Sequence, residues 1–287
     1  MSNDELERFP KLASKLTFGE DGIWYGSNRD TNQSLSYPDQ GNAACFAVEE
    51  NSFWFKHRND CIVAAVKTFP PLKGSPIMDI GGGNGFVAAA LVQAGFPTVV
   101  VEPGKVGANN AKRRGITTVI CATFEELNLR PETVPAVGLF DVLEHIENDS
   151  AFLRYCHDRL VTGGILYITV PALTALWSDE DCLAEHYRRY SLRHLSRELA
   201  SAGFHIEFAT YFFQWLPLPI FLFRTLPYRF GLARTHKKAI DSPRGHELKP
   251  RPLAILLERL LARETRCILA RKSLSFGSSC LVVARKK

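Results

Sequence analysis

Blocks of apolar residues alternate along this chain with blocks of mixed polarity, and the two kinds of block predict strands and helices in turn. Short apolar runs rich in β-branched residues predict buried strands at 76–80, 98–102, 118–121, 136–141 and 165–170. Apolar spacing, capping residues and glycine stops predict helices near 85–95, 105–114 and 149–160, the last ending before Gly163-Gly164. Strands that alternate with helices indicate an α/β, doubly wound and mostly parallel sheet.

Further elements flank this alternating pattern. We predict a helix over about 52–67, which Pro70 and Pro71 would stop, a helix around 192–202, and strands at 205–213 and 280–284. Residues 1–40 are polar and rich in turn residues, and predict a short helix or irregular structure at 4–16 followed by a weak hairpin.

Changes in this pattern divide the chain into four parts. They are an N-terminal extension (1–50), a core (51–213), an inserted helical or lid segment (214–276) and a last core strand (277–287). A second interruption, at 172–190, falls within the core. In the insert, the apolar run 215–223 is too short and too broken by prolines to span a bilayer. A polar loop at 235–252 and an amphipathic basic helix at 253–270 follow.

The densest chemical signal is the turn after the first predicted strand. Gly81, Gly83 and Gly85 occupy alternate positions there, and a helix opens at Phe86. Glycines allow positive φ angles and let a ligand lie against the backbone without a Cβ in the way. The free N–H groups of the helix N-terminus face the same ligand.

The spacing of this turn excludes a dinucleotide. The fingerprint G-x-G-x-x-G/A would need a small residue where Phe86 stands, and Asp79 would repel a pyrophosphate. A ligand that carries a sulfonium and an amino group, and no phosphate, would be attracted instead. Glu102 ends the next strand, where a carboxylate can accept hydrogen bonds from both hydroxyls of a ribose. A glycine-rich turn without a ligand, and a surface glutamate before a Pro-Gly turn, remain the alternatives.

The turn resembles the first motif of class I S-adenosylmethionine-dependent methyltransferases of the bacterial small-molecule type. The resemblance covers about 50–213 and the final strand, and implies a Rossmann-like, seven-stranded sheet with its last strand antiparallel. It implies S-adenosylmethionine as the cofactor. The cofactor contacts that we infer for it are Asp79, Gly81, Gly83, Gly85 and Glu102 at the turn and ribose, Thr123 and Phe124 at the adenine, and Asp141, Val142 and Arg58 at the methionine end. At this last position His57 is an alternative to Arg58 for binding the cofactor carboxylate.

The candidate catalytic residues follow the fourth and fifth predicted strands. The stretch Phe140–Ile146 resembles the F-D-x-x-x-x-H-x of many small-molecule methyltransferases, and this implies that His145 faces the acceptor. We expect His145, and secondarily His186, to act as general base, with Tyr187 orienting the acceptor. A solvent-exposed His145 with no such role is the alternative. The methyl donor is already activated, so the protein mainly positions the reactants.

The composition indicates the cellular compartment and argues against a structural metal, but it does not identify the methyl acceptor. The seven cysteines are dispersed without a C-x-x-C, which argues against a structural zinc and a disulfide framework; we expect no metal and a cytoplasmic protein. We expect the methyl acceptor to be a small hydrophobic or aromatic molecule, and the protein to act in small-molecule biosynthesis. We also expect residues 211–230 to contact a lipid surface. Residues 221–287 hold 16 Lys/Arg against 4 Asp/Glu, so an RNA methyltransferase is an alternative, although no N/D-P-P-Y/F motif or RNA-binding module is present. A non-catalytic cofactor-binding protein is another. The oligomeric state and the methylated atom (O, N or C) stay open.

Overall fold

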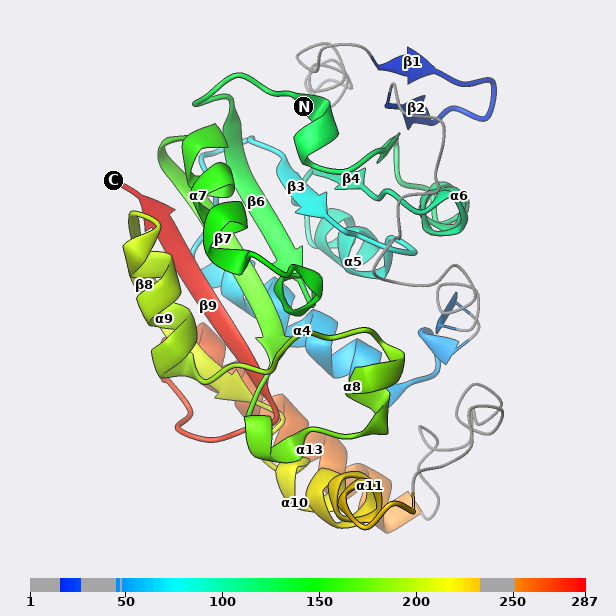
Figure 1. Cartoon of the computed structure of the whole chain (residues 1–287), viewed down its shortest axis with the longest axis vertical. Helices are drawn as coiled ribbons and strands as arrows, with labels where there is room; N and C mark the ends of the chain where they lie inside the picture. The colour runs from blue at the N-terminus through cyan, green and yellow to red at the C-terminus, as the bar shows by residue number, and fades with distance from the viewer. Residues whose placement is uncertain (1–15, 27–44, 47, 233–250) are drawn as a thin grey trace.

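The computed structural model describes residues 16–26, 45–46, 48–232 and 251–287, with 251–256 as backbone only. The helix predicted at 4–16 and most of the loop predicted at 235–252 lie outside these residues. One mostly parallel sheet with helices on both faces forms the centre of the molecule (Figure 1), which confirms the doubly wound α/β prediction.

Within the described residues the sheet holds nine strands, in the order β1-β2-β5-β4-β3-β6-β7-β9-β8. Their bounds are β1 Thr17–Phe18, β2 Trp24–Tyr25, β3 Ile77–Ile80, β4 Thr98–Val101, β5 Thr118–Cys121, β6 Val134–Phe140, β7 Leu160–Pro171, β8 Phe204–Phe212 and β9 Ser279–Lys286. The strands from β2 to β7 run parallel, and β9 pairs antiparallel with both β7 and β8. The last strand is therefore antiparallel, as the resemblance implied.

The predicted number of seven strands is wrong by two. The hairpin of β1 and β2 joins the edge of the sheet, where Trp24 and Tyr25 of β2 pair with Ile120 and Cys121 of β5. Each of these added strands has only two residues, which is too few for an alternating pattern to reveal that they belong to the sheet. The other seven strands form a sheet that is parallel except for its antiparallel last strand, as the resemblance implied.

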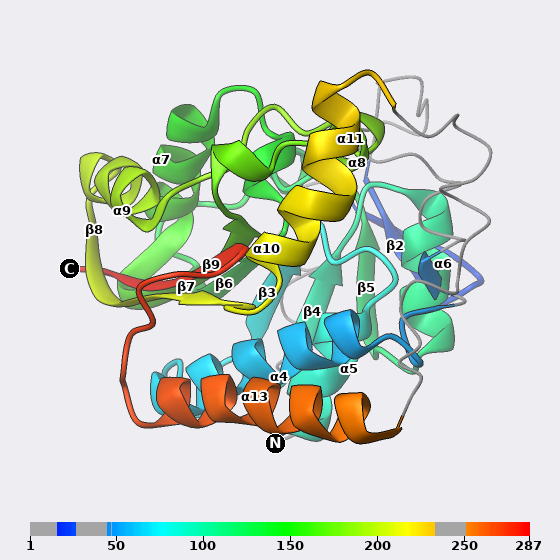
Figure 2. The ribbon, with the colours of Figure 1, turned by 90° about the horizontal axis from the view of Figure 1, so that it is seen from below.

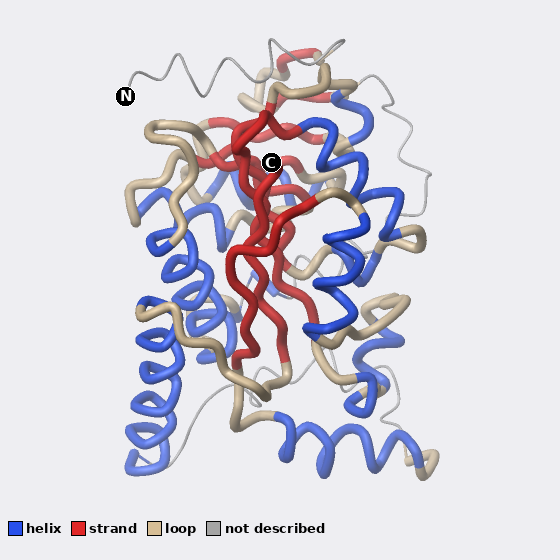
Figure 3. The backbone as a smooth tube through the Cα atoms, turned by 90° about the vertical axis from the view of Figure 1, so that its left-hand side faces the viewer, coloured by secondary structure: helices blue, strands red, loops and turns tan. Residues whose placement is uncertain are grey.

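Helices cover both faces of this sheet. Their bounds are α4 Phe53–Thr68, α5 Phe86–Gln93, α6 Lys105–Arg113, α7 Asp149–Arg159, α8 Asp179–Leu183, α9 Leu192–Ser201, α10 Pro217–Ile220, α11 Leu226–Arg229 and α13 Arg251–Leu269; shorter turns are η1 Glu125–Leu127, η2 Leu143–His145, η3 Thr174–Leu176 and the π-helical η4 Phe221–Thr225. Figure 2 shows α4, α5 and α13 on one face and α7, α9 and α10 to α11 on the other. In Figure 3 the strands form a central layer between these helices.

The burial of apolar side chains explains the two layers. The residues of β3 alternate between them: Met78 and Ile80 pack toward α7 and α9, whereas Ile77 packs toward α4, α5 and α13. A parallel strand that is buried on both faces needs an apolar residue at nearly every position. Asp79, which is also fully buried in β3, breaks this rule.

Two segments differ from their prediction. The strand predicted at 165–170 begins at Leu160, because the segment around Gly163 (φ 79°) bends within β7 instead of only closing α7. The interruption 172–190 contains η3 and α8. The basic helix predicted at 253–270 is confirmed as α13, whereas the division of the chain into four parts stays a prediction. Among the described residues, no helix combines the length and the apolar character that crossing a membrane requires.

Candidate active site

The glycine turn between β3 and α5 takes the backbone shape that its sequence predicts. Gly81, Gly83 and Gly85 have φ angles of 65°, 51° and 71°, a region that side chains with a Cβ rarely adopt. A Cβ built on Gly81 would lie 2.8 Å from Cγ2 of Val142, which follows β6. The turn and the end of β6 therefore approach each other so closely that only glycine fits. This contact brings Val142 to the predicted cofactor cradle.

Glu102 braces this turn from the end of β4. One carboxylate oxygen accepts a hydrogen bond from the Gly83 N–H at 2.8 Å, and the other accepts one from the Gly104 N–H at 2.7 Å. A carboxylate oxygen has lone pairs for more than one donor. Glu102 thus stands at the glycine turn, where a carboxylate can also receive the hydroxyls of a ribose.

Asp79 is the buried charge beneath the turn. Neither of its carboxylate oxygens has a hydrogen-bond partner among the described residues, and its side chain is almost fully buried. Burial raises the pKa of Asp79 to about 7, Arg58 opposes this shift, and Glu102 adds to it. A buried carboxyl without a partner is costly for the fold, and a cationic ligand would relieve that cost. The donor set at the turn therefore fits S-adenosylmethionine, whose sulfonium and amino group are cationic and which carries no phosphate.

Arg58 and Asp141, both predicted at the methionine end, meet each other. An Arg58 Nη1–H donates to Asp141 Oδ2 at 2.6 Å, and the guanidinium lies over the rings of Trp54 and Phe55. Thr169 donates to the other Asp141 oxygen at 3.2 Å. Asp141 itself has a φ of 57°, and non-glycine residues in this region cluster at functional sites. The pair joins α4 to the end of β6 beside the glycine turn.

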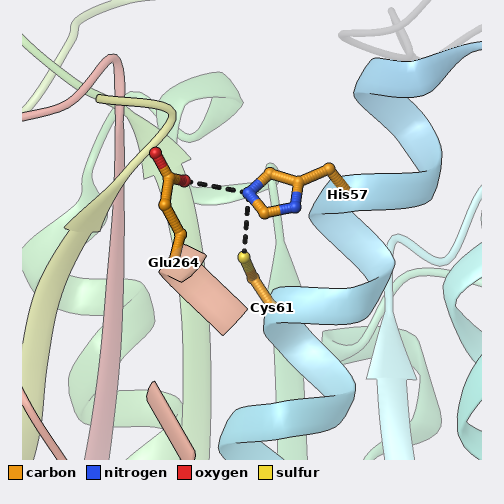
Figure 4. A group of neighbouring side chains, drawn as sticks. All are labelled: His57, Cys61 and Glu264. Atoms are coloured by element: carbon orange, nitrogen blue, oxygen red, sulfur yellow. Dashed lines mark hydrogen bonds and ion pairs between the residues drawn. The ribbon is translucent and has the colours of Figure 1, made fainter. Parts of the chain in front are cut away.

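A buried polar cluster fixes the helix that carries Arg58 (Figure 4). His57 and Cys61, one turn apart on α4, both point toward Glu264 of α13, and His57 Nε2 lies 2.9 Å from Glu264 Oε2 and 3.4 Å from Cys61 Sγ. Glu264 also accepts the backbone N–H groups of Phe213 and Gln214 at 2.7 and 2.8 Å. His57 therefore binds α13 within the protein, and its predicted alternative role at the cofactor carboxylate has no support in this placement.

The corner after β5 holds the two residues predicted at the adenine. The Thr123 N–H donates to Glu126 Oε2 at 2.8 Å. The ring of Phe124 is buried in the core, where it packs against Phe152 and Tyr155. Its side chain is thus engaged in the core instead of lining the turn. Thr123 is the better placed of the two, and the adenine contact stays a prediction.

On the acceptor side, the structure brings His145 and His186 together. Their ring centroids lie 4.7 Å apart in an edge-to-face arrangement. His186 Nδ1 lies 2.9 Å from Asp181 Oδ1, and Arg189 donates to the same oxygen at 2.7 Å. Burial acts to raise the pKa of Asp181, but the hydrogen bonds from His186 and Arg189 outweigh it and lower that pKa. Asp181, an ionised carboxylate, orients the imidazole of His186.

The environment of His145 differs. Burial, followed by the neighbouring His186, lowers the pKa of His145 to about 4. Tyr187, the third predicted catalytic residue, is half exposed, and its backbone N–H donates to the Glu144 carbonyl at 2.8 Å. Its ring is not packed into the histidine pair, and its orienting role stays a prediction.

The sequence argument missed two acidic residues at this site. Glu144 is almost fully buried, burial and then Asp141 raise its pKa well above the usual range, and its Oε2 has no hydrogen-bond partner among the described residues. Asp181 had one local signal, the capping box that it forms with Ser178 at the start of α8. Two trios among the described residues combine metal-ligand types within 4.8 Å, namely His57, Cys61 and Glu264, and Glu144, His145 and His186.

Known proteins share both the sequence pattern and the fold. Residues 54–207 match the model of the methyltransferase domain family. The chain is 30% identical over 115 residues to the mitochondrial ubiquinone biosynthesis O-methyltransferase of Rattus norvegicus, covering 37% of this chain and 33% of that protein. It is 25% identical over 158 residues to the Rhizobium etli enzyme of the same name, covering 49% and 64%. The chain thus spans between a third and two thirds of these two relatives.

A solved structure extends the similarity of fold. The phosphoethanolamine N-methyltransferase 2 of Haemonchus contortus, determined with phosphomonomethylethanolamine and S-adenosylhomocysteine, superposes with a TM-score of 0.56 at 19% identity. The match covers 88% of this chain and 58% of that one. The family match over more than half of the chain, the strand order and the glycine turn agree with one another: the chain belongs to the methyltransferase domain family, within the class I S-adenosylmethionine-dependent methyltransferases.

Proposed function

We propose that this protein transfers the methyl group of S-adenosylmethionine to a hydroxyl group of a small hydrophobic or aromatic acceptor. The observation that carries this proposal is the His186–Asp181 pair, which lies beside His145. Val142, three residues before His145, packs on the glycine turn. A hydroxyl acceptor needs a base in order to lose its proton, whereas an amine that binds neutral does not. The carboxylate–imidazole pair supplies such a base, so it favours oxygen over nitrogen as the methylated atom.

The residues divide the work of the reaction. When bound, the methyl donor supplies an activated methyl group on a sulfonium. Asp79, Glu102 and the glycine turn hold the cofactor, and Arg58 and Asp141 border its methionine end. His186 accepts the proton from the acceptor hydroxyl as the oxygen attacks the methyl carbon, and Asp181 stabilises the imidazolium that forms. The carbon–sulfur bond breaks with its electron pair on sulfur, which leaves the neutral thioether S-adenosylhomocysteine.

We propose the reverse of the predicted order of the two histidines, on electrostatic grounds. A base with a pKa of about 4, as for His145, is unprotonated at neutral pH but gains little by accepting a proton. His186 has the carboxylate partner that a catalytic imidazole requires. We therefore assign proton removal to His186 and a hydrogen-bonding role at the acceptor to His145.

The class of acceptor is supported by the names of the relatives and by the exposed apolar side chains. The matched relatives are named ubiquinone biosynthesis O-methyltransferases, which agrees with a small acceptor that is methylated on oxygen. The exposed apolar side chains between Trp215 and Phe230 support a hydrophobic acceptor. The basic C-terminal region leaves RNA as the competing acceptor, and a salt-dependent shift of RNA in a gel would favour it.

The experiment compares three histidine variants in a methyl-transfer screen over metabolite pools. His186→Ala should lower turnover by roughly 100- to 1,000-fold while S-adenosylmethionine binds as before, because only the base is lost. His145→Ala should cost about tenfold, which corresponds to one lost hydrogen bond. The exposed His205 serves as the matched control, and His205→Ala should turn over normally.

Full activity in both His186→Ala and His145→Ala would refute the assigned base. If the wild-type protein binds the cofactor in isothermal titration but methylates nothing in the screen, the non-catalytic alternative would replace the proposal. Variants that lose cofactor binding along with turnover would show that these histidines support the fold instead of the chemistry.

A further inference from the structure

The exposed apolar side chains of the described residues are concentrated in one short segment. Twelve large apolar residues are exposed in the part of the chain that the structure describes, and six of them lie between positions 215 and 232. These six are Trp215, Leu218, Leu222, Phe223, Phe230 and Leu232; we call them the apolar face. Phe223 and Phe230 are 75% and 76% exposed, so about three quarters of each side chain faces away from the chain that carries it.

Leu218, Leu222 and Phe223 of this face belong to a helix with two distinct sides, and the other three residues lie just before and after it. α10, η4 and α11 continue into one another from Pro217 to Arg229, and they form the helix at the lower edge of the molecule in Figure 1. Leu218 and Leu222, four positions apart, are exposed, whereas Pro217 and Thr225 are buried. Residues three or four apart share a helix side. The helix therefore packs on the protein with one side and presents the apolar face on another.

The segment that carries the apolar face has charged residues of one sign only, although Arg224 pairs with Glu180 of α8. No Asp or Glu occurs between Gln214 and Leu232, and the two charged residues there are Arg224 and Arg229, both exposed. A segment with exposed Trp, Phe and Leu side chains, arginines among them and no acidic residue of its own matches a segment that lies in the interface of an anionic membrane.

We propose that the apolar face is a docking surface for an anionic lipid bilayer. The aromatic and leucine side chains would enter the boundary between headgroups and acyl chains, and Arg229 would pair with lipid phosphate. A second copy of this chain would bring the same arginines against themselves. Like charges at an interface disfavour such a pairing, so charge complementarity selects the lipid.

The docking helix is attached to the acceptor side of the active site. Arg229 donates to the Ala175 carbonyl at 3.2 Å, Arg224 pairs with Glu180, and Cys182 Sγ lies 3.6 Å from the Tyr228 hydroxyl. Ala175, Glu180 and Cys182 flank Asp181, the partner of His186. A bilayer on this face would thus lie next to the acceptor loop, and a lipid-soluble acceptor would reach the site from the membrane. This last step rests on the proposed function, whereas the docking itself does not.

Co-sedimentation with vesicles tests the docking. Full-length protein is mixed with vesicles of phosphatidylcholine alone, or of phosphatidylcholine with phosphatidylglycerol, and pelleted. The wild-type protein should pellet with the anionic vesicles at least roughly fivefold more than with the neutral ones, and the double variant Leu222→Ser, Phe223→Ser should lose at least roughly fivefold of that binding. Leu72→Ser is the matched control, since Leu72 is 47% exposed and Leu222 45%; it should bind as the wild type does.

The outcomes separate lipid docking from its rivals and from the proposed function. Equal pelleting of the wild type and the double variant, or no pelleting of the wild type, would overturn the docking surface. A dimer in sedimentation velocity that only the double variant dissociates would assign the face to a second copy instead. Cofactor titration in the same samples should be unchanged in every variant, and a loss there would indicate misfolding of the variant and remove its support. Turnover in the histidine variants is measured separately, so the two proposals can fail independently.

Discussion

The cofactor side and the acceptor side of this active site are built in different ways. The cofactor side uses the ends of three neighbouring strands, and its polar groups are held by backbone geometry: Glu102 binds two backbone N–H groups, and Gly81 fits only because it lacks a Cβ. The acceptor side is assembled from η2, α8 and the loop before α9, where one buried carboxylate, Asp181, holds His186 and Arg189.

This difference indicates which part of the site is free to vary. A sheet fixes the spacing of its strand ends, so residues placed there cannot shift independently. Short helices and loops outside the sheet can change length and sequence without disturbing it. We therefore expect the cofactor side to vary little among relatives, and the acceptor side to be where this chain can differ from them.

The largest expected effect lies on the cofactor side. Glu102→Ala removes the carboxylate that braces the turn and that we assign to the ribose, so affinity for S-adenosylmethionine should fall by about 100-fold or more, a cost of roughly 3 kcal/mol for lost charge-assisted hydrogen bonds. Isothermal titration measures it. Glu125→Ala, which removes an exposed carboxylate on the same side of the sheet, is the control and should bind normally. Equal affinity in the two variants would contradict the assigned role of Glu102.

The next effect concerns the buried cluster of His57, Cys61 and Glu264, which joins α4 to α13. The Glu264 carboxylate accepts hydrogen bonds from two backbone N–H groups and lies beside His57. In Glu264→Gln one of the two carboxylate oxygens becomes an NH₂ group, which cannot accept the hydrogen bond that this oxygen accepted. The free energy of unfolding should fall by about 2 kcal/mol, because a buried donor is left without an acceptor. Urea denaturation measures this loss.

Glu258 provides the comparison for this variant, since it is exposed on the same helix. Glu258→Gln should change the free energy of unfolding by less than about 0.5 kcal/mol. If the two variants unfold at the same urea concentration, the cluster does not stabilise the contact between α4 and α13.

The last expected effect is a pH dependence caused by Asp79, which should change stability and cofactor affinity in opposite directions. Its pKa is raised to about 7 in the folded protein, so the folded state retains a proton that the unfolded state has lost. The free energy of unfolding without cofactor should therefore fall as pH rises from about 4 to about 7. Binding a cation favours the ionised carboxyl, so cofactor affinity should rise by roughly tenfold between pH 6 and pH 8.

The asparagine in Asp79→Asn cannot ionise, so this variant tests both the pH dependence of stability and the pH dependence of cofactor affinity. At pH 8 this variant should be more stable without cofactor by about 1–3 kcal/mol, and should bind the cofactor more weakly. The Asp79 part of the pH dependence of affinity should disappear. An unchanged pH profile in Asp79→Asn would show that another group controls cofactor affinity.

How much of the molecule could be predicted from its sequence follows from the range of its contacts. The turn from Asp79 to Phe86 and the strands around it were predicted because the relevant residues are adjacent, and their spacing alone excludes a dinucleotide. The nine-stranded count was missed because β1 and β2 have two residues each. Phe124 was assigned to the cofactor from its position after β5, but its burial depends on packing against Phe152 and Tyr155 of α7.

Contacts between distant residues escaped prediction altogether. Glu264 lies 207 positions after His57, and no local pattern in a single sequence relates a helix near the C-terminus to one before the first core strand. Asp181 reads locally as a helix-capping residue, and only the folded loop reveals that it holds His186. The pairing of Arg58 with Asp141 likewise joins two residues that the sequence placed at the same end of the cofactor without predicting their contact.

The position of β9 between β7 and β8 has a consequence for biosynthesis. β8 pairs with no named strand except β9, so when a ribosome makes the chain from its N-terminus, β8 emerges before the strand that will hold it. Until Ser279–Lys286 has been made, both β7 and β8 present an unpaired edge, which is a template for association with other nascent chains. A chaperone that binds such edges would have its longest period of contact with this protein during synthesis of the residues between Phe212 and Ser279.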